Sequence, residues 1–162
     1  MKKRWLNLYV ENSIGVLAKI SGLFSAKAYN LDSLTVGATE DTTISRMTIG
    51  LTSDDKTFEQ VKKQLGRCIE VIKVVDLTEL PIHQKELVFL TIHSCTPQEI
   101  EMLFKTAQVL ELTVLDCTGT AVMLQSVHSE ATNTRIIERL GKTYKNRMTL
   151  SRSGPLAEKT LI

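Results

Sequence analysis

Asn12 and Gly15 lie three positions apart in the segment Glu11-Asn12-Ser13-Ile14-Gly15-Val16-Leu17, which joins an expected strand to an expected helix. The first turn of a helix presents unpaired N–H groups and a positive dipole end, so it binds carboxylates well. Gly15 lets a ligand approach the backbone, and the Asn12 amide both donates and accepts hydrogen bonds. These residues suit the carboxylate and ammonium groups of an amino acid. The alternative stays equally open: Asn12 or Ser13 caps the helix, and Gly15 serves the turn.

Asn30 follows the far end of the same expected helix. An asparagine there often adopts the left-handed conformation that ends a helix. From the residue alone we favour that capping role over ligand contact.

Side chains with catalytic or metal-binding potential are scattered along the chain. The sequence holds no H-x-x-x-H, C-x-x-C or G-x-S-x-G pattern. The carboxylate pairs Glu40-Asp41 and Asp54-Asp55 fall at an expected turn and an expected helix start, where acidic residues are ordinary. We therefore predict no catalytic residues, no metal ligands and no enzymatic activity of the chain's own.

The elements that must position these residues follow from hydrophobic spacing. In the first half we expect a strand over 4–10, a helix over 15–28, strands over 31–38 and 44–51, a helix that starts at Ser53-Asp54-Asp55, and a strand over 69–77. The residues expected to face inward are Leu6, Leu8, Val10, Val16, Ile20, Leu23, Phe24, Ala28, Leu34 and Val36.

The second half repeats that order. We expect a strand over 87–94, a helix from Thr96-Pro97, strands over 112–117 and 121–127, a helix over 129–140, a short strand over 147–150 and a weakly patterned tail over 151–162. The repeated β-α-β-β-α-β order predicts an α+β protein of two ferredoxin-like domains. The predicted boundaries are 1–78 for the first domain, 79–85 for a linker and 86–162 for the second domain.

Composition excludes several classes of function. Twenty Lys and Arg against eighteen Asp and Glu, with 5% aromatic residues, do not predict nucleic-acid binding. The sequence contains no run of eighteen apolar residues, so we expect no membrane span. Cys68, Cys95 and Cys117 are odd in number and widely spaced, so we expect small buried hydrophobic residues in a cytoplasmic protein.

Four blocks in order carry a family resemblance. They are Glu11 to Leu17, Gly22-Leu23-Phe24-Ser25, Tyr29 to Val36 and Ile44-Ser45-Arg46-Met47-Thr48-Ile49, about a third of the chain. Together they resemble the small, regulatory subunit of acetolactate synthase, whose N-terminal portion is an ACT domain.

The resemblance implies a homodimer in which ACT domains of two chains lie side by side in a continuous sheet. Branched-chain amino acids, chiefly valine, bind at that dimer interface in the family, and the matching positions here are Asn12, Gly15, Val16, Leu17 and Asn30. The resemblance thus favours ligand contact over the capping role for Asn30. It also implies that the chain activates a catalytic large subunit and makes it sensitive to feedback in branched-chain amino-acid biosynthesis. Thiamine diphosphate, magnesium and FAD belong to that large subunit.

The second half resembles the family less closely. Pro155-Leu156-Ala157 follows Gly154 where many members carry a segment with glycine and arginine. An alternative function is a stand-alone tandem ACT-domain regulator of a transcription factor or another enzyme.

Overall fold

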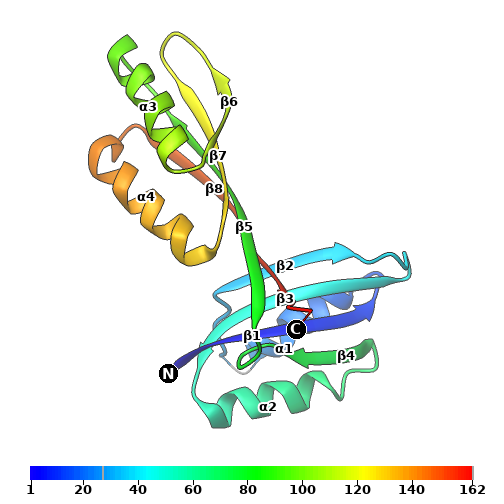
Figure 1. The fold of residues 1–162 in the computed structure, drawn as a ribbon. Coiled ribbons are helices and arrows are strands. Elements are labelled where there is room, and N and C mark those ends of the chain that lie inside the picture. The colour runs from blue at the N-terminus through cyan, green and yellow to red at the C-terminus, as the bar shows by residue number, and fades with distance from the viewer. Residues whose placement is uncertain (27, 162) are drawn as a thin grey trace. The chain divides into compact units, whose positions relative to one another are not determined.

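The alternating apolar residues near the N-terminus form the central part of a four-stranded antiparallel sheet (Figure 1). Its elements are β1 (Lys2–Glu11), α1 (Val16–Ala26), β2 (Ser33–Ala38), β3 (Ile44–Ser53), α2 (Asp55–Leu65) and β4 (Val71–Asp76). The strand order is β2-β3-β1-β4. This is the order of a ferredoxin-like fold, and β2 and β4 are its two edges.

The second series repeats this plan. Its elements are β5 (Ile82–Ile92), α3 (Pro97–Val109), β6 (Thr113–Cys117), β7 (Val122–His128), α4 (Glu130–Tyr144) and β8 (Met148–Lys159). The strand order is β6-β7-β5-β8. The predicted fold class, α+β with two ferredoxin-like βαββαβ domains, is confirmed.

The computed structural model describes residues 1–26 and 28–161. They divide into one unit of residues 1–83 and 155–162, and a second of residues 84–154. Residues 155–161 thus group with the first unit, whereas the sequence pattern assigned them to the second domain. Four residues of the expected linker, 82–85, belong to strand β5. Lys27, within the expected first helix, and Ile162, at the end of the expected second domain, lie outside the described residues.

Each unit has its own hydrophobic core between its sheet and its two helices. In the first unit, every second residue of β1 (Leu6, Leu8 and Val10) is fully buried against one face of α1 and of α2. In the second unit, Val88, Leu90 and Ile92 of β5 do the same beneath α3 and α4. The predicted inward positions of β1 are confirmed.

Two predicted inward positions are wrong. Helix α1 ends at Ala26, and Ala28 is exposed with a left-handed φ of +54°. Val36 on the edge strand β2 is 41% exposed, because no neighbouring strand covers it beyond β2. Cys117 is also exposed, although Cys95 is buried as expected, and all three cysteines are free thiols.

The end of the chain differs most from expectation. Strand β8 runs for twelve residues, from Met148 to Lys159, in place of the expected short strand and weakly patterned tail. Its second part lies on the face of the first sheet opposite the helices, where Ala157 is fully buried with Trp5 and Leu77.

Candidate effector-binding site

The loop between β1 and α1 is tied to the neighbouring hairpin by Asn12. Its backbone N–H donates to the Thr43 carbonyl at 2.7 Å, and its side-chain Nδ2 donates to the Thr42 carbonyl at 2.8 Å. The amide donor of Asn12 is therefore directed to the β2–β3 hairpin and not to the helix. The interpretation of Asn12 as a simple helix cap is not supported by this geometry.

Gly15 is the residue at which the chain turns into helix α1. Its φ is +89°, a conformation that favours glycine, and its carbonyl accepts the first helical hydrogen bond from the Lys19 N–H at 2.9 Å. A Cβ added to Gly15 would meet nothing within 4 Å, so the space in front of the backbone is open. The turn and the open approach are thus both present, and the two interpretations of Gly15 are compatible.

The first turn of α1 offers backbone donors to that open space. The Val16 N–H makes a long 3.4 Å contact with the Ser13 carbonyl, and the N–H groups of Leu17 and Ala18 have no carbonyl four residues earlier within the helix. The side chain of Val16 is buried in the core, whereas that of Leu17 is half exposed. Val16 can therefore contribute only its backbone, and Leu17 both its backbone and its side chain.

An ion pair lies one helical turn beyond the loop. Lys19 Nζ lies 2.6 Å from Glu70 Oε1, and this hydrogen bond raises the pKa of Lys19 and lowers the pKa of Glu70. The Glu70 carbonyl also accepts the Glu11 N–H at 2.9 Å. Both groups therefore stay charged near pH 7 and offset each other, so the N–H groups and the positive end of the helix are what favour an incoming carboxylate there.

Ile14 adds an apolar group beside these donors. Its side chain is fully exposed at the tip of the loop. An isolated exposed apolar residue is ordinary, but here it adjoins the half-exposed Leu17 and an open helix N-terminus. The loop therefore presents polar donors and an aliphatic surface together, which suits an amino acid with an aliphatic side chain.

Asn30 lies at the opposite end of α1. The left-handed residue that ends the helix is Ala28, and the Tyr29 N–H closes the turn on the Phe24 carbonyl at 3.0 Å. Asn30 is therefore not the left-handed cap that the residue type alone favoured. It lines a separate hollow of about 330 Å³ with Tyr29 and the end of β3.

The candidate residues thus form two groups within one chain. Asn12, Gly15, Val16 and Leu17 meet at the N-terminus of α1, and Asn30 lies beyond its C-terminus. A helix of eleven residues is about 16 Å long, which is longer than any amino acid. One small ligand cannot contact both groups of the same chain.

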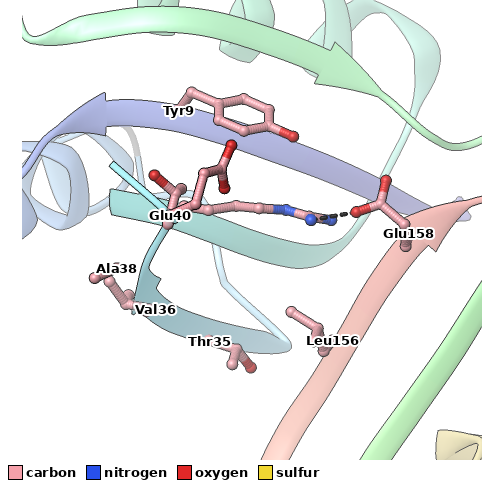
Figure 2. A pocket seen from close by; sticks show the side chains of 10 residues that line it. Tyr9, Thr35, Val36, Ala38, Glu40, Leu156 and Glu158 are labelled. Carbon is pink, nitrogen blue, oxygen red and sulfur yellow. Dashed lines mark hydrogen bonds and ion pairs between the residues drawn. The ribbon is translucent and has the colours of Figure 1, made fainter. Parts of the chain in front are cut away.

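Sequence reasoning missed a second hollow, of about 600 Å³, on the other face of the sheet (Figure 2). Tyr9, Thr35 and Val36 line it from the sheet, and Leu156 and Glu158 line it from β8. No sequence motif marks this hollow, because β8 contributes to it after about a hundred intervening residues.

Arg46 also lines this hollow. Its side chain is only 19% exposed, since it pairs with Glu158 and covers the ring of Tyr9 at 5.8 Å.

Comparison with known proteins identifies the family. Residues 6–73 match the family model described as the AHAS small subunit-like ACT domain. The chain is 33% identical over 140 residues to the acetolactate synthase small subunit of Aquifex aeolicus, covering 86% of this chain and 73% of that protein. It is 35% identical over 123 residues to that of Haemophilus influenzae, covering 76% and 75%. The chain belongs to the acetolactate synthase small subunit family.

Two further likenesses agree with this family. The probable acetolactate synthase small subunit of Archaeoglobus fulgidus is 44% identical over 111 residues, which span 68% of this chain and 65% of that protein. The crystal structure of the small subunit from Thermotoga maritima matches with a TM-score of 0.89 at 23% identity, over 100% of this chain and 99% of that one. The structural likeness supports the fold, and the sequence relatives support the family.

One aspartate of each acidic pair has a structural role. Asp54 caps α2 by accepting the Thr57 N–H at 2.8 Å, and that hydrogen bond lowers the pKa of Asp54. Asp41 accepts from the Thr43 side chain and backbone, which lowers the pKa of Asp41 too.

Within residues 1–26 and 28–161, no three His, Cys, Asp or Glu side chains are grouped to hold a metal ion. In the same ranges, no helix is long and apolar enough to cross a membrane.

Proposed function

We propose that this chain is a valine-sensing regulatory subunit that assembles with, activates and confers feedback inhibition on the catalytic large subunit of acetolactate synthase. Its relatives' names as small subunits support a partner that carries the chemistry. Thiamine diphosphate, magnesium and FAD would be bound by that large subunit and not by this chain. The observation that carries the sensing role is the open N-terminus of α1 beside Asn12 and Gly15.

The effector site is completed by a second copy of the chain. Asn12 and Asn30 lie at opposite ends of α1, so one ligand reaches both only if two helices lie antiparallel, with the N-terminus of one beside the C-terminus of the other. A two-fold axis between two copies gives that arrangement. Strand β2 supports this geometry because it lies at an edge of the first sheet and its Val36 side chain is exposed.

The chemistry at each end of the helix matches one part of valine. The N–H groups of Leu17 and Ala18, beside Gly15, suit the carboxylate. The amide oxygens of Asn12 and of Asn30 from the second copy suit the ammonium group. The aliphatic side chains of Ile14 and Leu17 suit the isopropyl group. Binding then favours one arrangement of the dimer interface, and the large subunit responds to that population.

Calorimetric titration of valine into the purified chain tests this function, with leucine, isoleucine and lysine as comparisons. We expect saturable binding of valine and none of lysine. The decisive pair of variants is Gly15→Asp and Gly15→Asn. Both residues tolerate a positive φ better than most, and both fit the open space, but only aspartate opposes a carboxylate ligand.

We expect Gly15→Asn to retain measurable valine binding and Gly15→Asp to lose it, with both variants still dimeric and still activating. Equal loss in both variants would indicate a backbone effect and would contradict the assigned carboxylate position. Binding of no branched-chain amino acid, together with co-purification of the large subunit, would leave an activating subunit without feedback.

A further inference from the structure

The face of the first sheet that carries no helices is occupied by the chain's own C-terminal segment, residues 155–158. Asn7 on β1 is buried on this face, and its Nδ2 donates to the Ala157 carbonyl at 3.0 Å. Arg46 on β3 donates to the same carbonyl. Ala157 itself is fully buried. One backbone carbonyl is therefore held by two side chains from the two central strands.

Two more contacts fix the segment on either side of Ala157. Thr35 Oγ1 on β2 donates to the Pro155 carbonyl at 3.2 Å, and Glu158 pairs with Arg46. The dashed line in Figure 2 marks this ion pair at the edge of the 600 Å³ hollow. Thr48 on β3 orients the Asn7 side chain, since the Thr48 hydroxyl donates to Asn7 Oδ1 at 2.9 Å. We call Asn7, Thr35 and Arg46 the clamp.

The clamped segment continues a strand of the other unit. Strand β8 contributes its first part, Met148–Ser153, to the second sheet, and Pro155 begins the clamped part. Gly154 joins the two parts with a φ of +76°, where a residue with a side chain would be strained. The chain thus passes from one unit to the clamp with a single glycine between them.

The clamp is also connected to the proposed effector loop. Asn12 holds the β2–β3 hairpin through the carbonyls of Thr42 and Thr43. Thr39 and Glu40 of the same hairpin line the hollow that Glu158 also lines. A ligand that displaces Asn12 therefore also displaces the hairpin residues that line the hollow beside the clamp.

We propose that the clamp on residues 155–158 is the coupling element through which the effector loop of the first unit biases strand β8 of the second. The inference rests on the proposed valine site, because it concerns how occupancy of that site is transmitted. Coupling between two sites requires an element whose state both sites influence. The carbonyl of Ala157, with its two donors, is such an element, since each donor belongs to the effector-binding sheet.

The test replaces the clamp residue that contacts the segment twice. Arg46→Gln removes the ion pair with Glu158 and weakens the bond to Ala157, and Glu158→Gln removes the ion pair alone. Lys105→Gln is the matched control, because it breaks an exposed pair with Glu101 on α3. Arg46→Lys keeps the charge and should restore part of the effect.

Two readouts separate coupling from binding. Valine affinity is measured by calorimetry without and with the large subunit, and amide hydrogen exchange is followed in residues 148–153. In the unmodified chain we expect the large subunit to change valine affinity within the range of ~5–150-fold that is usual for allosteric coupling, and valine to alter exchange in residues 148–153. In Arg46→Gln, valine should still bind, but both changes should disappear, and Glu158→Gln should reduce them in the same direction.

Full coupling in both Arg46→Gln and Glu158→Gln would overturn the proposal. Unchanged exchange in residues 148–153 of the unmodified chain, despite saturating valine, would overturn it as well and leave the valine site standing. If Arg46→Gln does not fold, Glu158→Gln decides, because Glu158 is largely exposed and its loss leaves the carbonyl bonds in place. If valine binds no form of the chain, the proposed sensing function fails first, and the coupling role fails with it.

Discussion

Arg152 and Glu86 form a bidentate ion pair in the second unit. Arg152 Nε and Nη2 donate to the two carboxylate oxygens of Glu86 at 2.9 and 2.8 Å. The Glu86 side chain is only 2% exposed, whereas that of Arg152 is 32% exposed. Asn133 Nδ2 donates to Glu86 at 3.0 Å, and the Ser126 hydroxyl donates to Asn133 at 2.6 Å. A buried charge is therefore satisfied from β8, α4 and β7 together.

Arg152→Ala should destabilise the second unit strongly. The substitution leaves a buried carboxylate with one amide partner, and removal of one member of a buried ion pair costs about 3 kcal/mol or more. Urea denaturation followed by circular dichroism measures the loss. Lys105→Gln, which breaks an exposed ion pair, should change stability by less than about 1 kcal/mol. Similar losses in the two variants would show that Glu86 gains little from Arg152.

Glu99 should make the stability of the second unit depend on pH in the acid range. Arg147, and then the N–H of Thr96, lower the pKa of Glu99 from its ordinary value of 4.5 to about 2. A carboxyl group with a lowered folded-state pKa contributes stability that is complete above the unfolded-state value and is lost as the pH falls toward the folded-state value. The loss should therefore occur between about pH 4.5 and pH 2.

Glu99→Gln isolates this charge effect, because glutamine at the same position still completes the capping box with Thr96. Thermal melts at several pH values should show a flatter acid dependence in Glu99→Gln than in the unmodified chain. Parallel curves for the two proteins between pH 4.5 and pH 2 would assign the acid sensitivity to other carboxylates.

How far the sequence predicts this molecule depends on what each residue contacts. Leu8 and Leu90 could be placed in the cores because alternation along a strand records which side is buried. The long strand β8 could not, because Pro155 and Ala157 are held through their carbonyl oxygens, which every residue type possesses. Backbone acceptors leave no pattern in a sequence.

Only the part of the candidate site formed by neighbouring residues in the chain could be predicted from the sequence. Asn12 and Gly15 are neighbours in the chain, so their common location at the start of α1 follows from local spacing. Asn30 lies at the far end of that helix, and its relation to Asn12 depends on a second copy of the chain. The capping role of Asn30 was wrongly favoured because Ala28, a residue that seldom adopts positive φ, takes the left-handed position.

Gly50 should not tolerate a side chain. It pairs with Trp5 across β3 and β1, and a Cβ added to Gly50 would lie 2.8 Å from the Trp5 ring and 2.5 Å from the Ser33 hydroxyl. The hydroxyl can rotate away, but Trp5 is 9% exposed and packs with Leu77 and Ala157. Gly50→Ala should therefore move the ring at a cost of about 1–3 kcal/mol, as overpacking usually does.

Trp5 is the single tryptophan of the chain, so its fluorescence reports the displacement expected in Gly50→Ala. The emission should shift to the red as the ring gains water contact, and the urea midpoint should fall. Gly119→Ala is the control, because nothing lies within 4 Å of its Cβ and its φ is not positive. It should leave the Trp5 spectrum unchanged. An unshifted spectrum together with an unchanged urea midpoint in Gly50→Ala would contradict the prediction, because both results would show that the added methyl group is accommodated without displacing the ring.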